Sequence, residues 1–386
     1  MRPADWPEIG PDLLDPPDER RERRWIPRRR PALGVRATAV PTALFVGIGM
    51  VLGPYGVGVL SPAVLAQSHA VGWVALAVIG VFVGLGLGGR RPAGTVTADL
   101  LGSSALAVIT AAALAAALAA LVGAAAPPLP GVGTSTALLI GLCLSVSAAV
   151  QPNPGDSLAL RRASQLAHFD DVPLMVGGAV VVAVLAADAA ALRVAATVVA
   201  GAAIGAAGCL LFEQADESER GLFVAGAVLL LAGVGAYLGT SPLLSGAVAA
   251  IVWVRTPGAA DRITAHDLRT LQHPLVALLL VMAGAQVTWT PAVLWLAAGA
   301  LVARLAAKLL ASLAVARREG LPAALLAAVL LPPGVMGIAL AVNATLLLGD
   351  SRGWIVSTVT LATVASEVLA AFLPVTDDAT GPGAAA

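Results

Sequence analysis

The sequence predicts an all-α membrane protein of about twelve transmembrane helices. Of its 386 residues, 58% are hydrophobic and only 12% are charged, whereas soluble globular proteins average about 25% charged residues. Apolar windows of roughly 20 residues, the length that crosses a bilayer as a helix, recur along almost the whole chain. Arginines gather in alternate loops, as expected when a chain crosses the membrane between them. Together these observations indicate a polytopic helical bundle.

The apolar windows form one continuous membrane domain, residues 37–374, with short loops. We expect the flanking tails, 1–36 and 375–386, to be disordered because they are rich in proline, glycine and charge. In chain order the windows are 38–60, 70–88, 98–123, 132–150, 164–187, 190–212, 221–239, 241–255, 272–288, 291–315, 321–348 and 353–374.

The arginines predict the orientation of the chain in the membrane. Seven of them lie between residues 20 and 30, in the tail before the first window. Loops on the same side as this tail carry ten more, and the opposite loops carry only Arg193 and Arg352. Because cytoplasmic loops are enriched in Lys and Arg, we expect both termini to be cytoplasmic and the protein to be a multi-pass protein of the inner (plasma) membrane.

Two windows are predicted to be broken helices. The fourth ends at Pro152 and Pro154, and the eleventh carries Pro332, Pro333 and Gly334 near its middle. Proline removes a backbone donor and clashes with the preceding turn. These windows are the middle members of two triplets, windows three to five and ten to twelve, which favours an inverted-repeat secondary transporter. A loop or a simple kink at each proline pair is the alternative.

Five charged residues lie well inside the windows, six or more residues from either end, and all of them are in the two triplets: Asp170, Asp171, Arg304, Lys308 and Glu367. Charges inside a membrane are costly and commonly serve function. We therefore take them as the candidate site.

Asp170 and Asp171 are adjacent, so they point about 100° apart on a helix. One can pair with a cation on another helix while the other faces a cavity. Because two close carboxylates in a low dielectric do not both ionise easily, we expect one of them to hold either a proton or a hard cation. The alternative is a solvated helix N-terminus.

Lys308 is the sole lysine among the 23 basic residues. It lies four residues after Arg304, on the same helix face. A buried lysine titrates readily whereas an arginine does not, so we expect Lys308 to be a proton-binding partner of the aspartates. The alternative is snorkelling to an interface. Arg304 and Glu367 are expected to be structural charges, with Arg304 pairing Glu367 or capping carbonyls at the broken helices.

Other function classes find no support in the sequence. It contains no hydrolase, kinase or zinc signature, and Cys143 and Cys209 lie in apolar runs with no metal-binding spacing. The formal net charge is zero, which gives no indication of a nucleic-acid partner. We expect no enzyme activity and no cofactor.

Four segments resemble a known family in order and spacing. The run GIGMVLGPYGVGVL at 47–60, after Pro41, is similar to "P…GxxLGPxGLGLL", and YLGTSPLLSGAVAA at 237–250 is similar to "LGLSPLLGAFLAG". Residues 271–287 resemble "PLFFVLVGLxL", and KLLASLAVAR at 308–317 resembles "GKxLGAxLAAR". The chain thus resembles the monovalent cation/proton antiporter superfamily, in particular the cation:proton antiporter-2 branch with the sodium/hydrogen exchanger domain, from about residue 41 to 374.

The resemblance implies a core domain and a dimerisation domain, an elevator-like movement of the core, and a homodimer. It implies that Asp171 is the essential ion-binding aspartate, that Asp170 precedes it as in electrogenic members, and that Lys308 pairs with Asp170. The broken helices would line the ion site.

Three departures accompany this resemblance. The additional first helix of many members is not found, and the fourth window lacks their Thr-Asp pair. That window offers only Ser147, Gln151 and backbone carbonyls to an ion. Where members have PRGE, the eleventh window has the uncharged run PPGV, which includes Pro333 and Gly334.

We therefore expect an antiporter in the lipid bilayer that exchanges a monovalent cation for protons, with Na⁺ preferred over K⁺ and with Li⁺ as a further candidate. A sodium-coupled organic-solute symporter of related fold is one alternative. A non-transporting membrane sensor or scaffold is the other.

Overall fold

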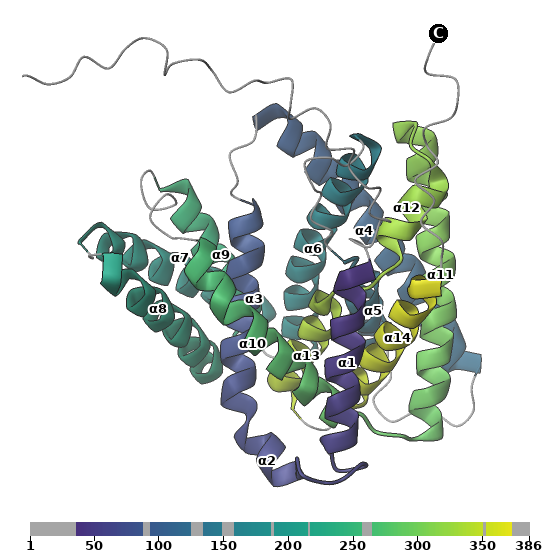
Figure 1. The fold of residues 1–386 in the computed structure, drawn as a ribbon, viewed down its shortest axis with the longest axis horizontal. Helices are drawn as coiled ribbons and strands as arrows, with labels where there is room; N and C mark the ends of the chain where they lie inside the picture. Colours follow the sequence, from purple (N-terminus) through teal and green to yellow (C-terminus); the bar gives the residue numbers. More distant parts are fainter. Residues whose placement is uncertain are drawn as a thin grey trace, which may run out of the picture.

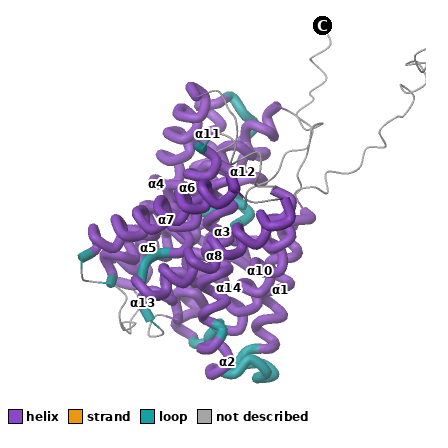
Figure 2. The backbone as a smooth tube through the Cα atoms, turned by 90° about the vertical axis from the view of Figure 1, so that its left-hand side faces the viewer, coloured by secondary structure: helices purple, strands orange, loops and turns teal. Residues whose placement is uncertain are grey.

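The computed structural model describes residues 36–87, 93–124, 134–148, 158–186, 189–214, 217–256, 265–349 and 353–372. The predicted disordered tails lie outside these residues, apart from Arg36. Helices and short connections make up the described part, which contains no strand (Figure 2). The helices are α1 (Arg36–Leu52), α2 (Pro62–Gln67), α3 (His69–Leu87), α4 (Ala93–Ala124), α5 (Thr134–Ser145), α6 (Leu158–Leu185), α7 (Ala190–Gln214), α8 (Glu217–Leu238), α9 (Pro242–Arg255), α10 (Ala265–Ala285), α11 (Pro291–Glu319), α12 (Ala323–Leu330), α13 (Val335–Leu348) and α14 (Gly353–Phe372).

The all-helical prediction is confirmed for the described residues. Seven segments are long and apolar enough to cross a membrane, among them 323–348, which contains the break between α12 and α13. Five further helical segments of the described residues, in α1, α4, α5, α9 and α10, are apolar over 10 to 17 residues. Large apolar side chains stay exposed along α7, α8 and α11, for example Leu192 at 69%, Leu222 at 74% and Val302 at 67%. Exposed apolar surface of this extent fits a lipid environment.

Two of the predicted helix ends were wrong. The window 38–60 ends as a helix at Leu52, because Gly53 and Pro54 turn the chain and Gly58 takes a left-handed φ of 77°. The window 132–150 ends as a helix at Ser145, ahead of its prolines. In the first window, backbone breakers therefore end the helix before the hydrophobic pattern does.

The helices pack in two groups (Figure 1). The scaffold group comprises α1, α3 and α7–α10, and the site group comprises α4–α6 and α11–α14. Small residues allow close approach within the scaffold group: a Cβ on Gly80 of α3 would clash with the Leu243 carbonyl of α9, and one on Gly246 would clash with the Ala77 carbonyl. Such small-residue contacts are typical of helix packing in membranes.

Candidate functional site

Two interrupted segments meet in the middle of the site group. α5 ends at Ser145 and continues as extended backbone over residues 146–148, while residues 331–334 separate α12 from α13. The Ala148 amide donates a hydrogen bond of 2.7 Å to the Pro332 carbonyl. The predicted break in the eleventh window is therefore confirmed. The residues after 148, including Gln151, Pro152 and Pro154, lie outside the described residues, so the rest of the fourth window stays a prediction.

Glycine allows these two segments to lie so close together. A Cβ on Gly334 would lie 3.1 Å from the Ser147 carbonyl oxygen, and one on Gly337 would clash with the Cys143 carbonyl oxygen. Pro332 and Pro333 supply no backbone N–H, which ends α12, and Gly334 then begins α13 without a side-chain cap. The break therefore leaves the carbonyl end of α12 and the amide end of α13 inside the protein.

Arg304 of α11 donates hydrogen bonds to backbone carbonyls at both helix breaks. Its Nη2 donates to the Val146 carbonyl at 2.9 Å and to the Leu331 carbonyl at 3.1 Å, and its Nε donates to Ser366 Oγ at 3.3 Å. The Arg304 side chain is fully buried. Of its two expected roles, capping the broken-helix carbonyls is thus the one the geometry shows. No ion pair joins Arg304 to Glu367 within the described part of the chain.

Lys308 lies one turn further along α11 and contacts Asp170 of α6. Lys308 Nζ is 2.9 Å from Asp170 Oδ2 and donates to Ser147 Oγ at 2.7 Å. Ser147 Oγ in turn donates to Asp170 Oδ2 at 3.0 Å. All three side chains are at most 1% exposed. The expected contact between Lys308 and Asp170 is therefore present, and snorkelling of Lys308 is excluded.

Asp171 is the carboxylate without a cationic partner in this cluster. It is 8% exposed, and its Oδ1 has no hydrogen-bond partner among the described residues. It sits mid-helix in α6, so the alternative of a solvated helix N-terminus does not hold. The structure thus brings Asp170, Asp171 and Lys308 together. Asp170 and Lys308 are bonded to each other, and Asp171 lies beside them.

Glu367 of α14 lies at the boundary with the scaffold group. It is 3% exposed, and it hydrogen-bonds with the Thr42 side chain and the Ala43 backbone of α1. Its Oε2 has no partner among the described groups. Sequence reasoning missed Thr42 and Ser366 as partners of the buried charges. The available signal was a hydroxyl residue inside an apolar window, which is too common to single out these two.

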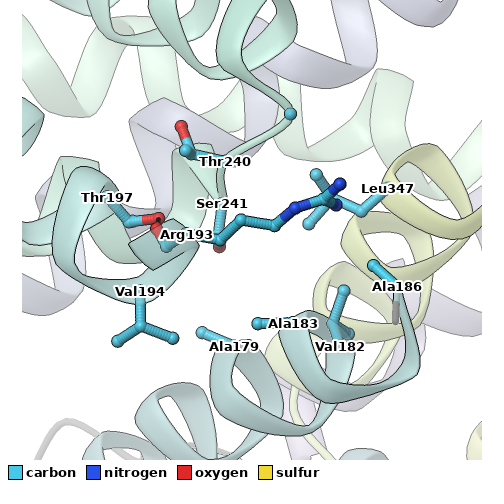
Figure 3. Close-up of a pocket in the computed structure, with 11 residues that line it drawn as sticks. Ala179, Val182, Ala183, Ala186, Arg193, Val194, Thr197, Thr240, Ser241 and Leu347 are labelled. Atoms are coloured by element: carbon cyan, nitrogen blue, oxygen red, sulfur yellow. Dashed lines mark hydrogen bonds between the residues drawn. The ribbon is translucent and has the colours of Figure 1, made fainter. Parts of the chain in front are cut away.

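A pocket among the described residues lies away from these charges. It is bordered by the end of α6, the start of α7, residues 239–241 and Leu347, and the Arg193 side chain extends across it (Figure 3). None of the five buried ionisable residues lines it. Within the described part of the chain, no group of three His, Cys, Asp or Glu residues has the arrangement of a metal site.

The structure is similar to that of the sodium proton antiporter MjNhaP1 from Methanocaldococcus jannaschii, with a TM-score of 0.59. The two sequences are 15% identical, and the match covers 88% of this chain and 94% of the other. No protein-family model matches the chain, and no curated protein matches it in sequence. The chain therefore has the sodium/hydrogen exchanger-type antiporter fold that the sequence resemblance predicted.

Proposed function

We propose that this protein is a secondary active antiporter that exchanges a monovalent cation, Na⁺ in preference to K⁺, for protons. The observation that carries this proposal is the placement of Asp171. Its neighbour Asp170 is bonded through Oδ2 to Lys308 and Ser147, whereas Asp171 has no cation bonded to it among the described residues. The Oδ1 atoms of both aspartates lack a hydrogen-bond partner. A buried carboxylate without a cationic partner is costly to keep ionised, and a proton and a hard cation are the two ligands that would neutralise Asp171.

The charge balance of the cluster supports competition between these two ligands. The buried ionisable residues of the described chain comprise two cations, Arg304 and Lys308, and three carboxylates, Asp170, Asp171 and Glu367. Fully ionised, the cluster has one net negative charge. One bound proton or one monovalent cation makes it neutral, and binding both at Asp171 is unfavourable. Such competition is sufficient to couple a cation flux to a proton flux.

The Lys308–Asp170 ion pair is a second proton-binding element of the proposed exchange. We propose that this pair separates when Asp170 takes up a proton and forms again when Asp170 releases it. Lys308 is the partner that can lose its own proton while the pair is apart. If both aspartates exchange protons, more than one proton moves per cation and the exchange is electrogenic. Clamping the membrane potential with valinomycin and K⁺ should then change the exchange rate, and a rate that ignores the potential indicates electroneutral exchange.

Reconstituted protein tests the proposal directly. In proteoliposomes with an imposed pH gradient, adding Na⁺ or Li⁺ outside should dissipate the gradient, and K⁺ should do so less. Asp171→Asn should abolish the exchange. The matched control is Gly233→Ala on exposed α8, where an added Cβ meets nothing within 4 Å. Full exchange by the Asp171→Asn variant would rule out the site assignment.

The same assay separates the alternatives. An organic-solute symporter would leave the pH gradient intact and take up an anionic solute with Na⁺. That reading needs a cation free to meet the solute, whereas Arg304 is fully buried and two of its three nitrogens are bonded to protein oxygens. A sensor or scaffold would move no ion at all under any gradient.

We further propose that the site group moves against the scaffold group as an elevator. Few polar contacts cross the boundary; in one of them Ser241 Oγ of the α8–α9 connection donates to Asn343 Oδ1 of α13 at 3.2 Å. A disulfide between cysteines placed at these two positions, with Cys143 and Cys209 replaced by alanine, should stop exchange. Reduction should restore it. Undiminished exchange in the oxidised variant would exclude relative movement at this contact.

The assembly and orientation remain part of the proposal. We propose a homodimer in the inner (plasma) membrane with both termini cytoplasmic. Light scattering of the detergent-solubilised protein should give twice the chain mass after subtraction of the detergent. Protease cleavage of an N-terminal tag should occur in inverted vesicles and fail in intact spheroplasts. The opposite accessibility would reverse the topology.

A further inference from the structure

One face of α14 carries a line of buried polar side chains that the proposed ion site does not use. Ser357, Thr360, Thr363 and Glu367 follow one another at intervals of three, three and four residues, so they lie within a sector of about 120° of the helix surface. Their exposed fractions are 0%, 0%, 1% and 3%. At a rise of 1.5 Å per residue, the line runs for about 15 Å along the helix.

Most of this line has no protein partner. Thr360 Oγ1, Thr363 Oγ1 and Glu367 Oε2 lack hydrogen bonds to any of the described residues. Buried hydroxyls and carboxylates are nearly always hydrogen-bonded, and ordered water is the usual partner where protein groups are missing. Side chains three or four residues apart have Cβ atoms about 5–6 Å from each other. That spacing suits one bridging water, which makes a hydrogen bond of about 2.8 Å to each side.

Both ends of the line are tied to the scaffold side of the molecule. At one end, the Thr288 amide donates to Ser357 Oγ at 3.0 Å, and the Ser357 hydroxyl can donate either to the Gln286 carbonyl at 3.3 Å or to the Gly353 carbonyl of its own helix at 3.2 Å. Both partners lie in the half-exposed connection after α10, beside Trp289, which is 48% exposed. At the other end is Glu367, bonded to α1. The line therefore joins a surface connection to a buried carboxylate.

We propose that Thr360, Thr363 and Glu367 bind a file of water molecules along α14, and that Glu367 exchanges its proton through this water. The proton leaves the carboxyl group for the adjacent water while a proton passes from water to water towards the connection after α10, so no bond other than O–H bonds forms or breaks. The charged group that acts on Glu367 is Arg304, which keeps its bonds to the helix breaks. Proton exchange at Glu367 is distinct from ion binding at Asp171, although both carboxylates count in the charge of the same buried cluster.

Replacing threonine with valine tests the water file, because valine keeps the shape and removes the hydroxyl. Thr358 is the matched control: it is fully buried and also unpartnered, but it lies about 200° around the helix from Thr360. We expect Thr360→Val and Thr363→Val to lower the apparent Tm in detergent, and Thr358→Val to lower it as well, because its buried unpartnered hydroxyl needs a water by the same argument. If the line is dry, all three variants gain stability alike, and the proposal is wrong.

Infrared difference spectroscopy on the full chain tests the proton exchange. A pH-dependent band of a protonated carboxyl group should be present in the wild type and lost in Glu367→Gln. On transfer to D₂O this band should shift, and the double variant Thr360→Val/Thr363→Val should slow the shift about tenfold, which corresponds to about 1.4 kcal/mol of activation free energy. Thr358→Val should keep the wild-type rate. A spectrum without a Glu367-dependent band, or equal rates in all variants, overturns the proposal.

Discussion

Breaking the ion pair between Lys308 and Asp170 should destabilise the protein strongly, and removing both charges should restore most of the loss. Lys308 Nζ and Asp170 Oδ2 are 2.9 Å apart, and the side chains are 1% and 0% exposed. Solvent therefore screens the pair little. Removing one partner of a buried pair typically costs about 3–5 kcal/mol, because the other charge stays buried without compensation.

The loss in free energy of unfolding in each single variant should depend on the groups that remain around the charge that is left. In Lys308→Met, Asp170 keeps the hydrogen bond from Ser147 and can take up a proton, so the cost should lie near 3 kcal/mol. In Asp170→Asn, Lys308 keeps its bond to Ser147, and the charge of Asp171 acts on it as well. In the double variant no uncompensated charge remains at these two positions. Its cost should be only about 0–2 kcal/mol, because well-packed neutral groups often replace a buried pair without loss.

A double-mutant cycle measures this difference. Reversible unfolding in mixed micelles, titrated with sodium dodecyl sulfate and followed by the fluorescence of the seven tryptophans, gives the free energy of unfolding of each variant. The coupling between the two positions should be about 3 kcal/mol or more. If the cost of the double variant equals the sum of the two single costs, the pair does not contribute as the structure indicates. The reasoning about a buried coupled site would then be refuted.

Three further variants test the packing of the helix breaks by the same unfolding assay. Arg304→Lys loses the bond from Nε to Ser366 and the reach of the guanidinium, whose Nη2 binds both carbonyls, and should cost about 2–4 kcal/mol. A cost as small as that of an ordinary surface substitution would contradict the bridging role. Gly337→Ala places a Cβ against the Cys143 carbonyl and should cost about 1–3 kcal/mol. The control Gly233→Ala on α8 should instead raise the free energy of unfolding by about 0.5–1 kcal/mol. Equal effects of Gly337→Ala and Gly233→Ala would show that α13 does not approach the end of α5 closely. Ser147→Ala removes two hydrogen bonds to charged groups and should cost about 2–4 kcal/mol, with normal stability as the contradicting result.

The sequence was sufficient for the helical architecture because the bilayer imposes a simple rule. Every span must be apolar and about 20 residues long, and each of the twelve predicted windows overlaps a helix in the described structure. The break at 331–334 was predictable because proline and glycine act on the backbone locally, whatever surrounds them. The helix end at Leu52 was missed because the apolar residues continue through the turn that follows it.

The charged residues of the site were predictable, and so were some of their contacts. Rare intramembrane charges identified Asp170, Asp171, Lys308, Arg304 and Glu367, because their burial is costly in any fold. The pairing of Lys308 with Asp170 and the capping of broken-helix carbonyls by Arg304 were also expected and are present. The bonds to Ser366 and Thr42 were missed, because these hydroxyl residues are ordinary groups whose importance arises only when α1, α11 and α14 meet.

The helix ends change the charge balance that the side chains alone suggest. The carbonyl ends of α5 and α12 carry about half a negative charge each, and the amide end of α13 carries about half a positive charge. Arg304 is bonded to both carbonyl ends, so it neutralises helix dipoles rather than carboxylates. The cluster then has a net charge of about −1.5 instead of −1. One cation at Asp171 leaves it slightly negative, which still favours a proton on Glu367. A cation at Asp171 and a proton on Glu367 are therefore compatible, so Glu367→Gln should leave cation-dependent stabilisation of the protein intact while Asp171→Asn removes it.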